Sequence, residues 1–234
     1  MMTRLTNTKH NSPTSIVSKA VYGLLRIFLG LSIYAFGVYL TIYANIGLAP
    51  WDCLAVGISR HIPLSYGGTM AAISLTAILI QLLLHERIGI ATVFDAVITG
   101  NLTQLICDMS PYPENHSILL GIGYMFIGFL FIAFGMYVYM KAELGCGPKD
   151  GLFIAIGKKL PKLSVGAVGI MLSTIVTLFG WLLGGDIGIG TVFFTFGAGT
   201  IMHLFYSAIG FDPRKLQHKS LTETVKLLSG KYPF

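Results

Sequence analysis

The sequence predicts an all-α, polytopic membrane protein, a bundle of about six transmembrane helices built from two three-helix repeats of inverted topology. Hydrophobic residues make up 54% of the 234 residues and charged residues only 11%, whereas a soluble domain carries about 25% charged residues. Several runs of about 20 residues hold few or no charges, which is the length needed to cross the hydrocarbon core. The segments after the first and fourth of these runs share a pattern, about 98 residues apart.

Six stretches have the length and apolarity to span a membrane. They are Tyr22–Ala44, Gly68–Leu84, Gly89–Cys107, Ser117–Met140, Ser164–Leu183 and Gly188–Gly210. We divide the chain into a polar cytosolic tail (1–19), a first membrane repeat (20–109), a second membrane repeat (116–210) and a basic cytosolic tail (211–234).

The internal repeat is visible when the sequence is shifted against itself. A shift of 98 matches the following pairs: Gly30 and Gly128, Ala35 and Ala133, Gly47 and Gly145, Pro50 and Pro148, Asp52 and Asp150. A shift of 99 then matches "LSYG" at 64–67 with "LSVG" at 163–166, and "GIATVF" at 89–94 with "GIGTVF" at 188–193. Three crossings in each repeat place the second copy upside down, as in many secondary transporters.

Glycines on the first helix of each repeat support close packing. Gly30 and Gly37 are seven residues apart, and so are Gly128 and Gly135. This spacing forms one stripe of small residues on a helix, which allows two backbones to approach closely. We expect these two helices to lie at the interface between the repeats.

The loop charges predict the orientation. With the N-terminus inside, the loop 141–163, with five lysines, falls in the cytosol, and the acidic loop 107–116 falls outside. Every loop then follows the positive-inside bias. The alternative, in which the short segments also span to give eight helices, would place the acidic loop inside.

The repeated segments "GLAPWD" and "GCGPKD" predict broken helices. In each, a glycine ends the long helix, a proline suits the first turn of a new one, and an aspartate lies near the exposed N–H groups of that turn. The residues that shape the breaks are Gly47, Pro50, Gly145 and Pro148. In one interpretation Asp52 and Asp150 only cap short interfacial helices. In the other, these helices are re-entrant and line a shared cavity where the two aspartates contact a polar solute or ion.

The two copies differ in chemistry around these aspartates. Trp51 in the first copy corresponds to Lys149 in the second, so the two ends of a pathway would not be equal. Asp95 lies inside the third span near Thr92, whose counterpart is Thr191. An intramembrane carboxylate is costly and suggests function, either in a solute- or proton-related site or paired with a neighbouring helix. We therefore select seven candidate substrate-binding or gating residues: Asp52, Asp150, Asp95, Trp51, Lys149, Thr92 and Thr191.

These segments, together with the "GIGT" turn at 188–191, resemble the YczE-like bacterial integral membrane proteins of the YczE/YyaS/YitT group. The resemblance covers about residues 22–210, and Ala91 in "GIAT" departs from the glycine of the second copy. It implies a small protein of the bacterial cytoplasmic (inner) membrane and no particular substrate.

The sequence lacks the motifs of several common chemistries. The sequence has no phosphate-binding loop, no His-Glu-x-x-His, no Gly-x-Ser-x-Gly and no cluster of His and carboxylates at ligand spacing. We expect no catalytic residue, no cofactor, no metal site and no nucleic-acid partner. The expected function is passage of a small solute or ion through the lipid bilayer, with a second copy or a membrane partner left open. The alternatives are a substrate-capture subunit of an energy-coupled system and a regulatory or scaffolding membrane protein.

Overall fold

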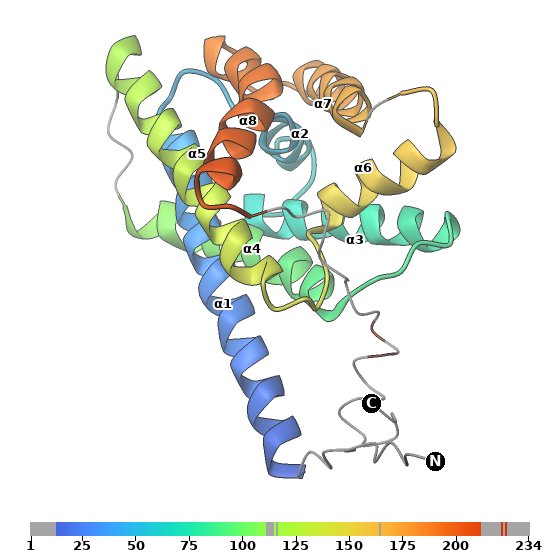
Figure 1. The fold of residues 1–234 in the computed structure, drawn as a ribbon. Coiled ribbons are helices and arrows are strands. Elements are labelled where there is room, and N and C mark those ends of the chain that lie inside the picture. The colour runs from blue at the N-terminus through green and yellow to red at the C-terminus, as the bar shows by residue number, and fades with distance from the viewer. Residues whose placement is uncertain are drawn as a thin grey trace, which may run out of the picture.

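A computed structural model describes residues 13–110, 115, 117–163, 165–211, 221 and 223 (Figure 1). Eight α-helices, and no strand, form within this part of the chain. They are α1 (Pro13–Tyr43), α2 (Pro50–Ser59), α3 (Tyr66–Leu83), α4 (Ile90–Met109), α5 (Ile118–Met140), α6 (Pro148–Lys159), α7 (Val165–Leu182) and α8 (Ile189–Ala208). The all-helical fold class predicted from the sequence is confirmed.

The most extensive packing between two helices is that of α1 and α5, which lie side by side (Figure 1). A Cβ on Gly30 would lie 2.6 Å from the backbone nitrogen of Tyr139, and one on Gly37 would lie 2.7 Å from that of Ile132. Residue numbers on α1 therefore rise while those on α5 fall, and the two helices are antiparallel. Only glycines allow this approach, so the predicted glycine stripe lies where these helices cross.

The short helices pack on the opposite halves of the chain. Helix α2 packs mainly against α7, and α6 packs mainly against α3. Within each half, α4 packs against α1 and α8 packs against α5 in matching ways, while α1 and α5 join the two halves. Each half therefore completes the core of the other, and neither half forms a separate bundle.

Five of the described helices are long and apolar enough to cross a membrane. They are α1 over Val21–Tyr43, and α3, α4, α5 and α8 over their full lengths. The apolar stretch of α7, Gly166–Leu182, is shorter. With 10 and 12 residues, α2 and α6 are only about 15–18 Å long at 1.5 Å per residue, too short for a core of about 30 Å.

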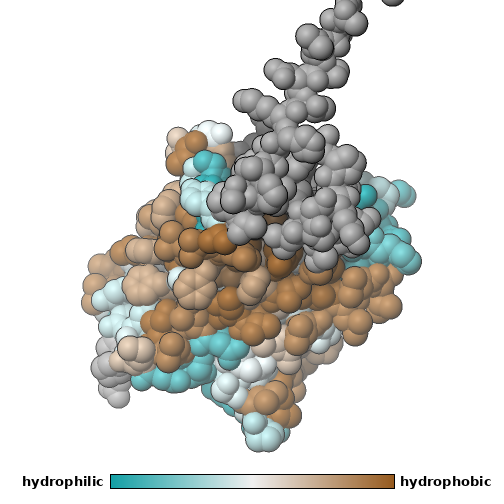
Figure 2. Space-filling view, turned by 90° about the horizontal axis from the view of Figure 1, so that it is seen from below, coloured by the Kyte–Doolittle hydropathy of each residue, from teal (hydrophilic) through white to brown (hydrophobic). Residues whose placement is uncertain are grey.

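The outer surface is apolar, as expected of a protein in contact with lipid. Large hydrophobic side chains are exposed on several helices, among them Leu79, Leu83, Leu119, Leu178 and Phe196. Figure 2 shows hydrophobic residues over much of the visible face. These observations identify a multi-pass helical membrane protein.

Some of the predicted segments are not covered by the structure. Most of the two tails, 1–19 and 211–234, and much of the loop 107–116 lie outside the described residues. Helix α1 begins at Pro13, inside the segment predicted to be a polar tail.

Candidate functional site

Each short helix begins after a sharp break at a glycine with positive φ, 116° at Gly47 and 130° at Gly145. These breaks lie against the start of a helix from the other half. The amide of Gly190 donates to the carbonyl of Ile46 at 2.8 Å, and the amide of Ala91 donates to that of Leu144 at 2.9 Å. The exposed ends of four helices thus satisfy one another in pairs, which lets irregular backbone lie inside the bundle.

Two of the candidate residues, Thr92 and Thr191, hold the breaks and do not line the cavity described below. The hydroxyl of Thr92 donates to the carbonyl of Cys146 at 2.6 Å. The hydroxyl of Thr191 accepts from the amide of Gly188 at 3.1 Å. Pro50 and Pro148 occupy the first turns of α2 and α6 and are buried, as the sequence predicts.

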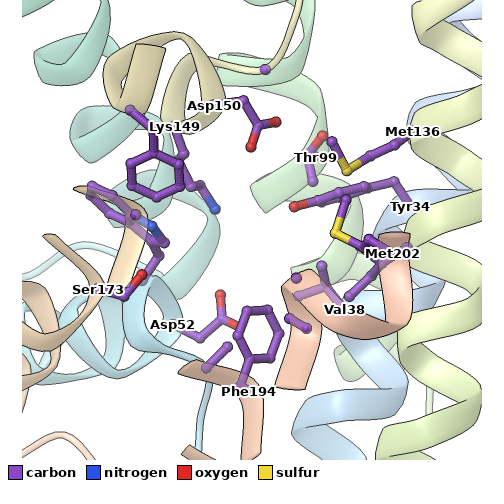
Figure 3. Close-up of a pocket in the computed structure, with 18 of the residues that line it drawn as sticks. Tyr34, Val38, Asp52, Thr99, Met136, Lys149, Asp150, Ser173, Phe194 and Met202 are labelled. Atoms are coloured by element: carbon purple, nitrogen blue, oxygen red, sulfur yellow. The ribbon is translucent and has the colours of Figure 1, made fainter. Parts of the chain in front are cut away.

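The first turns of both short helices open into one cavity of about 330 Å³ (Figure 3). Every one of the eight described helices contributes lining residues. Five of the candidate residues line the cavity: Asp52, Asp150, Asp95, Trp51 and Lys149. The volume lies at the lower end of the range of about 300–1,000 Å³ that small-molecule sites occupy.

On the α2 side, the carboxylate is held by a neighbour. Asp52 is only 4% exposed, and the hydroxyl of Tyr66 donates to its Oδ1 at 2.9 Å. Helix α2 is not a membrane-spanning segment. Burial raises the pKa of Asp52, whereas Lys149 and the Tyr66 hydroxyl act in the opposite direction.

On the α6 side, two carboxylates face each other across the N-cap residue of the helix. A Cβ on Gly147 would lie 2.8 Å from Oδ2 of Asp95 and 3.0 Å from Oδ2 of Asp150, so these oxygens are close neighbours. Thr99 donates a short hydrogen bond to Asp95 from within α4. Asp150 has no hydrogen bond or ion pair with any described residue.

Charge and burial perturb this second carboxylate. Helix α6 does not span the membrane either, and burial together with the Asp95 carboxylate raises the pKa of Asp150 to about 6, against the effect of Lys149. Figure 3 shows the Lys149 nitrogen directed into the cavity between Asp52 and Asp150. Within the described part of the chain, Lys149 forms no ion pair within 4.0 Å, so its charge also faces the cavity.

Both aspartates lie in the first turn of their helix, as the capping interpretation expects, but neither makes a capping hydrogen bond. Among the described residues, neither carboxylate accepts a hydrogen bond from a backbone N–H, and neither short helix has a side-chain cap. For Asp95, pairing with a neighbouring helix was the alternative to a solute-related role. Among the described residues, its hydrogen-bond partner, Thr99, belongs to its own helix.

Sequence reasoning missed several polar lining residues. Tyr34, Ser74 and Ser173 line the cavity, and Tyr66 bonds to Asp52. One signal was present: Ser74 and Ser173 correspond under the shift of 99, and Tyr66 is the residue at which "LSYG" differs from "LSVG". Tyr34 has no such signal, because only the packing of α1 turns it inward.

The described residues contain no group of three His, Cys, Asp or Glu side chains placed to hold a metal ion. The three cysteines form no disulfide with one another; Cys53 and Cys107 are buried and Cys146 is partly buried.

Comparison with known proteins gives family-level matches. Residues 21–207 match the model of a family of unknown function, DUF6198. A Haemophilus influenzae protein described as uncharacterised is 30% identical, over 83% of this chain and 88% of the relative. The Bacillus subtilis protein YyaS is 26% identical over 76% of this chain and 89% of its own length. The uncharacterised membrane protein YczE of the same organism is 29% identical over 75% of this chain and 81% of its own length. No solved structure matches the chain.

Proposed function

The chain belongs to the DUF6198 family, and from that premise we propose that it carries a small solute or ion across the membrane through the cavity between its two halves. The observation that carries the proposal is the meeting of both broken helices in one cavity, with Asp52 and Asp150 in its wall. Secondary transporters bind their substrates at such sites, where the ends of discontinuous helices meet between repeats.

Several contacts support an inverted-repeat arrangement. Helices α1 and α5 are antiparallel, and the exchanged contacts come in pairs: α2 with α7 and α6 with α3. The amide bonds at Ile46 and Leu144 form a third such pair. In this proposal the protein lies in the bacterial inner membrane with both termini in the cytosol, because this orientation places the lysine-rich loop 141–163 inside.

Transport, and not catalysis, fits the site. The cavity brings together carboxylates, a lysine and aromatic rings, but no nucleophile with a base and an orienting third group is apparent among the lining residues. Passage requires that the cavity open alternately to each side, which inverted repeats achieve by rocking of one half against the other.

The test is uptake by sealed proteoliposomes that contain the purified full-length chain. We expect saturable uptake of a solute from a labelled panel, with or without a proton or sodium gradient. Asp150→Asn is expected to reduce it, and Asp108→Asn, at an exposed site outside the cavity, is not. Uptake that appears only with a co-reconstituted ATPase would identify a capture subunit, and no uptake of any solute would refute autonomous transport.

The orientation has its own test. Single cysteines at positions 60 and 159, in a background without the native cysteines, should react with an impermeant reagent from opposite sides of the membrane. Labelling from the same side would contradict the inverted arrangement.

A further inference from the structure

The cavity lining has more acidic than basic side chains. Three carboxylates line it, those of Asp52, Asp95 and Asp150, and Lys149 is the one basic residue among the described lining residues. Asp52 already accepts a hydrogen bond from Tyr66. Asp95 also accepts one, from Thr99, but its Oδ2 and that of Asp150 both lie beside Gly147, so the negative charge is densest there.

Two like charges in a partly buried site repel each other unless a positive charge lies between them. Lys149 is the nearest candidate on the chain, yet it makes no ion pair with a described carboxylate. A bound cation would complete the site without moving any helix. An anion would meet Lys149 but also three carboxylates, so the balance of charge disfavours it.

The remaining lining favours a cation with an apolar body over a bare ion. Aromatic side chains from five helices line the cavity: Tyr34, Trp51, Phe129, Phe153 and Phe194. The rings of Trp51 and Phe153 lie 6.2 Å apart and join the two short helices. Aromatic faces attract organic cations, and the space of about 330 Å³ is far larger than one dehydrated metal ion needs. The described residues also offer no group of three metal-ligating side chains.

We infer that the cavity binds a small organic cation, an amine or a quaternary ammonium compound with an apolar body, whose charged head lies at Asp95 and Asp150 and whose body lies against the aromatic residues. This inference rests on the proposed function, because it names the substrate class of the same site. It assigns Lys149 a definite effect: its positive charge opposes the cation and limits the affinity.

A binding experiment can use the chain's own fluorescence. The sequence has two tryptophans, Trp51 in the cavity and Trp181 on the outer surface, 52% exposed. In a Trp181→Phe background in nanodiscs, Trp51 is the reporter. The probe is benzyltrimethylammonium, a cation that does not titrate. The neutral isostere neopentylbenzene and the anion benzenesulfonate are the controls.

We expect the cation to change the fluorescence of Trp51 saturably and both controls to bind at least tenfold more weakly. Asp95→Asn and Asp150→Asn should each weaken binding of the cation at least tenfold, while Lys149→Gln should strengthen it several-fold. Asp108→Asn, outside the cavity, should leave it unchanged. A purely structural role for these residues would not move the affinity in opposite directions.

Three results would overturn the inference: equal binding of the neutral isostere, tighter binding of benzenesulfonate, or a Lys149→Gln variant that binds the cation more weakly. If Asp150→Asn does not fold, a decrease of affinity in Asp95→Asn and an increase in Lys149→Gln still decide the matter. Failure of the inference is distinguishable from failure of the proposed function. Binding of the cation without transport supports the inference and refutes transport, whereas transport of a neutral or anionic solute without cation binding does the reverse.

Discussion

Helices α2 and α6 begin with the same Gly-x-x-Pro-x-Asp pattern and pack in corresponding ways, yet their aspartates have different surroundings. Asp52 on α2 is 4% exposed and bonded to Tyr66. Asp150 on α6 has no hydrogen-bond partner among the described residues, because the position that corresponds to Tyr66 is Val165. The duplicated framework therefore carries one carboxylate held by the protein and one left available to the cavity.

The residues that face the two aspartates widen this difference. The counterpart of Asp95 is Phe194, so only the α6 side has a second carboxylate. Trp51 lies beside Asp52 where Lys149 lies beside Asp150. The two halves therefore share one backbone arrangement but place different side chains around the cavity.

The largest expected effect tests whether the two helix breaks are packed equally tightly in the two halves. An added methyl group in Gly89→Ala would overlap the carbonyl oxygen of Leu144, and one in Gly188→Ala would overlap that of Ile46. These oxygens are backbone atoms that cannot rotate away. We expect both variants to lose about 3 kcal/mol or more of stability, measured as a lower melting temperature in detergent.

The controls are Gly123→Ala and Gly199→Ala, at which an added Cβ meets nothing within 4 Å. Both lie inside helices, so they should be neutral or slightly stabilising. A large loss at only one of Gly89 and Gly188 would break the equivalence of the two helix breaks.

The next effect tests the difference between the aspartates. Tyr66→Phe removes the donor to the buried Asp52 and should destabilise the protein by about 1–3 kcal/mol. Asp150→Asn removes a charge that lies beside Asp95 and should stabilise the protein by about 1 kcal/mol, the repulsion being discounted for solvent screening. Thermal melting of both variants without ligand measures these stability changes. A change of the same sign in both variants would contradict the difference between the two aspartates.

The pH dependence of stability tests the Asp150 side of this comparison. The pKa of Asp150 is raised to about 6 in the folded protein, so the folded state binds its proton more tightly than the unfolded state does. The contribution is present in full below the unfolded pKa of about 3.9 and is lost as the pH rises through about 6. The wild type should therefore lose more stability than Asp150→Asn between these limits, and identical curves would refute the assignment.

Much of the framework could be predicted from the sequence. Of the six predicted spans, five match helix bounds within about two residues, those of α3, α4, α5, α7 and α8, because hydrophobic length and glycine or proline breaks are local signals. The sixth, α1, begins nine residues earlier than predicted, and α7 is shorter than the helices long enough to span. Which surfaces meet is not local. The packing of α2 on α7, and the Tyr66–Asp52 bond across 14 residues, depend on tertiary contacts that no periodicity specifies.

The same limit applies to the candidate site. An aspartate in a span and two in broken helices were visible as costly charges, so Asp52, Asp95 and Asp150 could be selected. That two of them are neighbours could not be predicted, because Asp95 and Gly147 come together only when α6 packs in the other half. Thr92 and Thr191 were selected with them, but their hydrogen bonds place them at the helix breaks.

The smallest expected effect concerns the far ends of the short helices, where one exposed ion pair ties each helix to the opposite half. Arg60 after α2 lies 2.8 Å from Asp186, and Lys158 in α6 lies 2.6 Å from Glu86. Exposed pairs contribute at most about 1 kcal/mol and are screened by salt. In double-mutant cycles with Arg60→Gln/Asp186→Asn and Lys158→Gln/Glu86→Gln, we expect two small coupling energies, both reduced at 1 M salt. Because the side chain of Glu86 is 20% exposed and that of Asp186 is 67% exposed, the α6 pair should be the stronger. A larger coupling energy for the α2 pair would mean that burial of the carboxylate does not determine which ion pair is stronger.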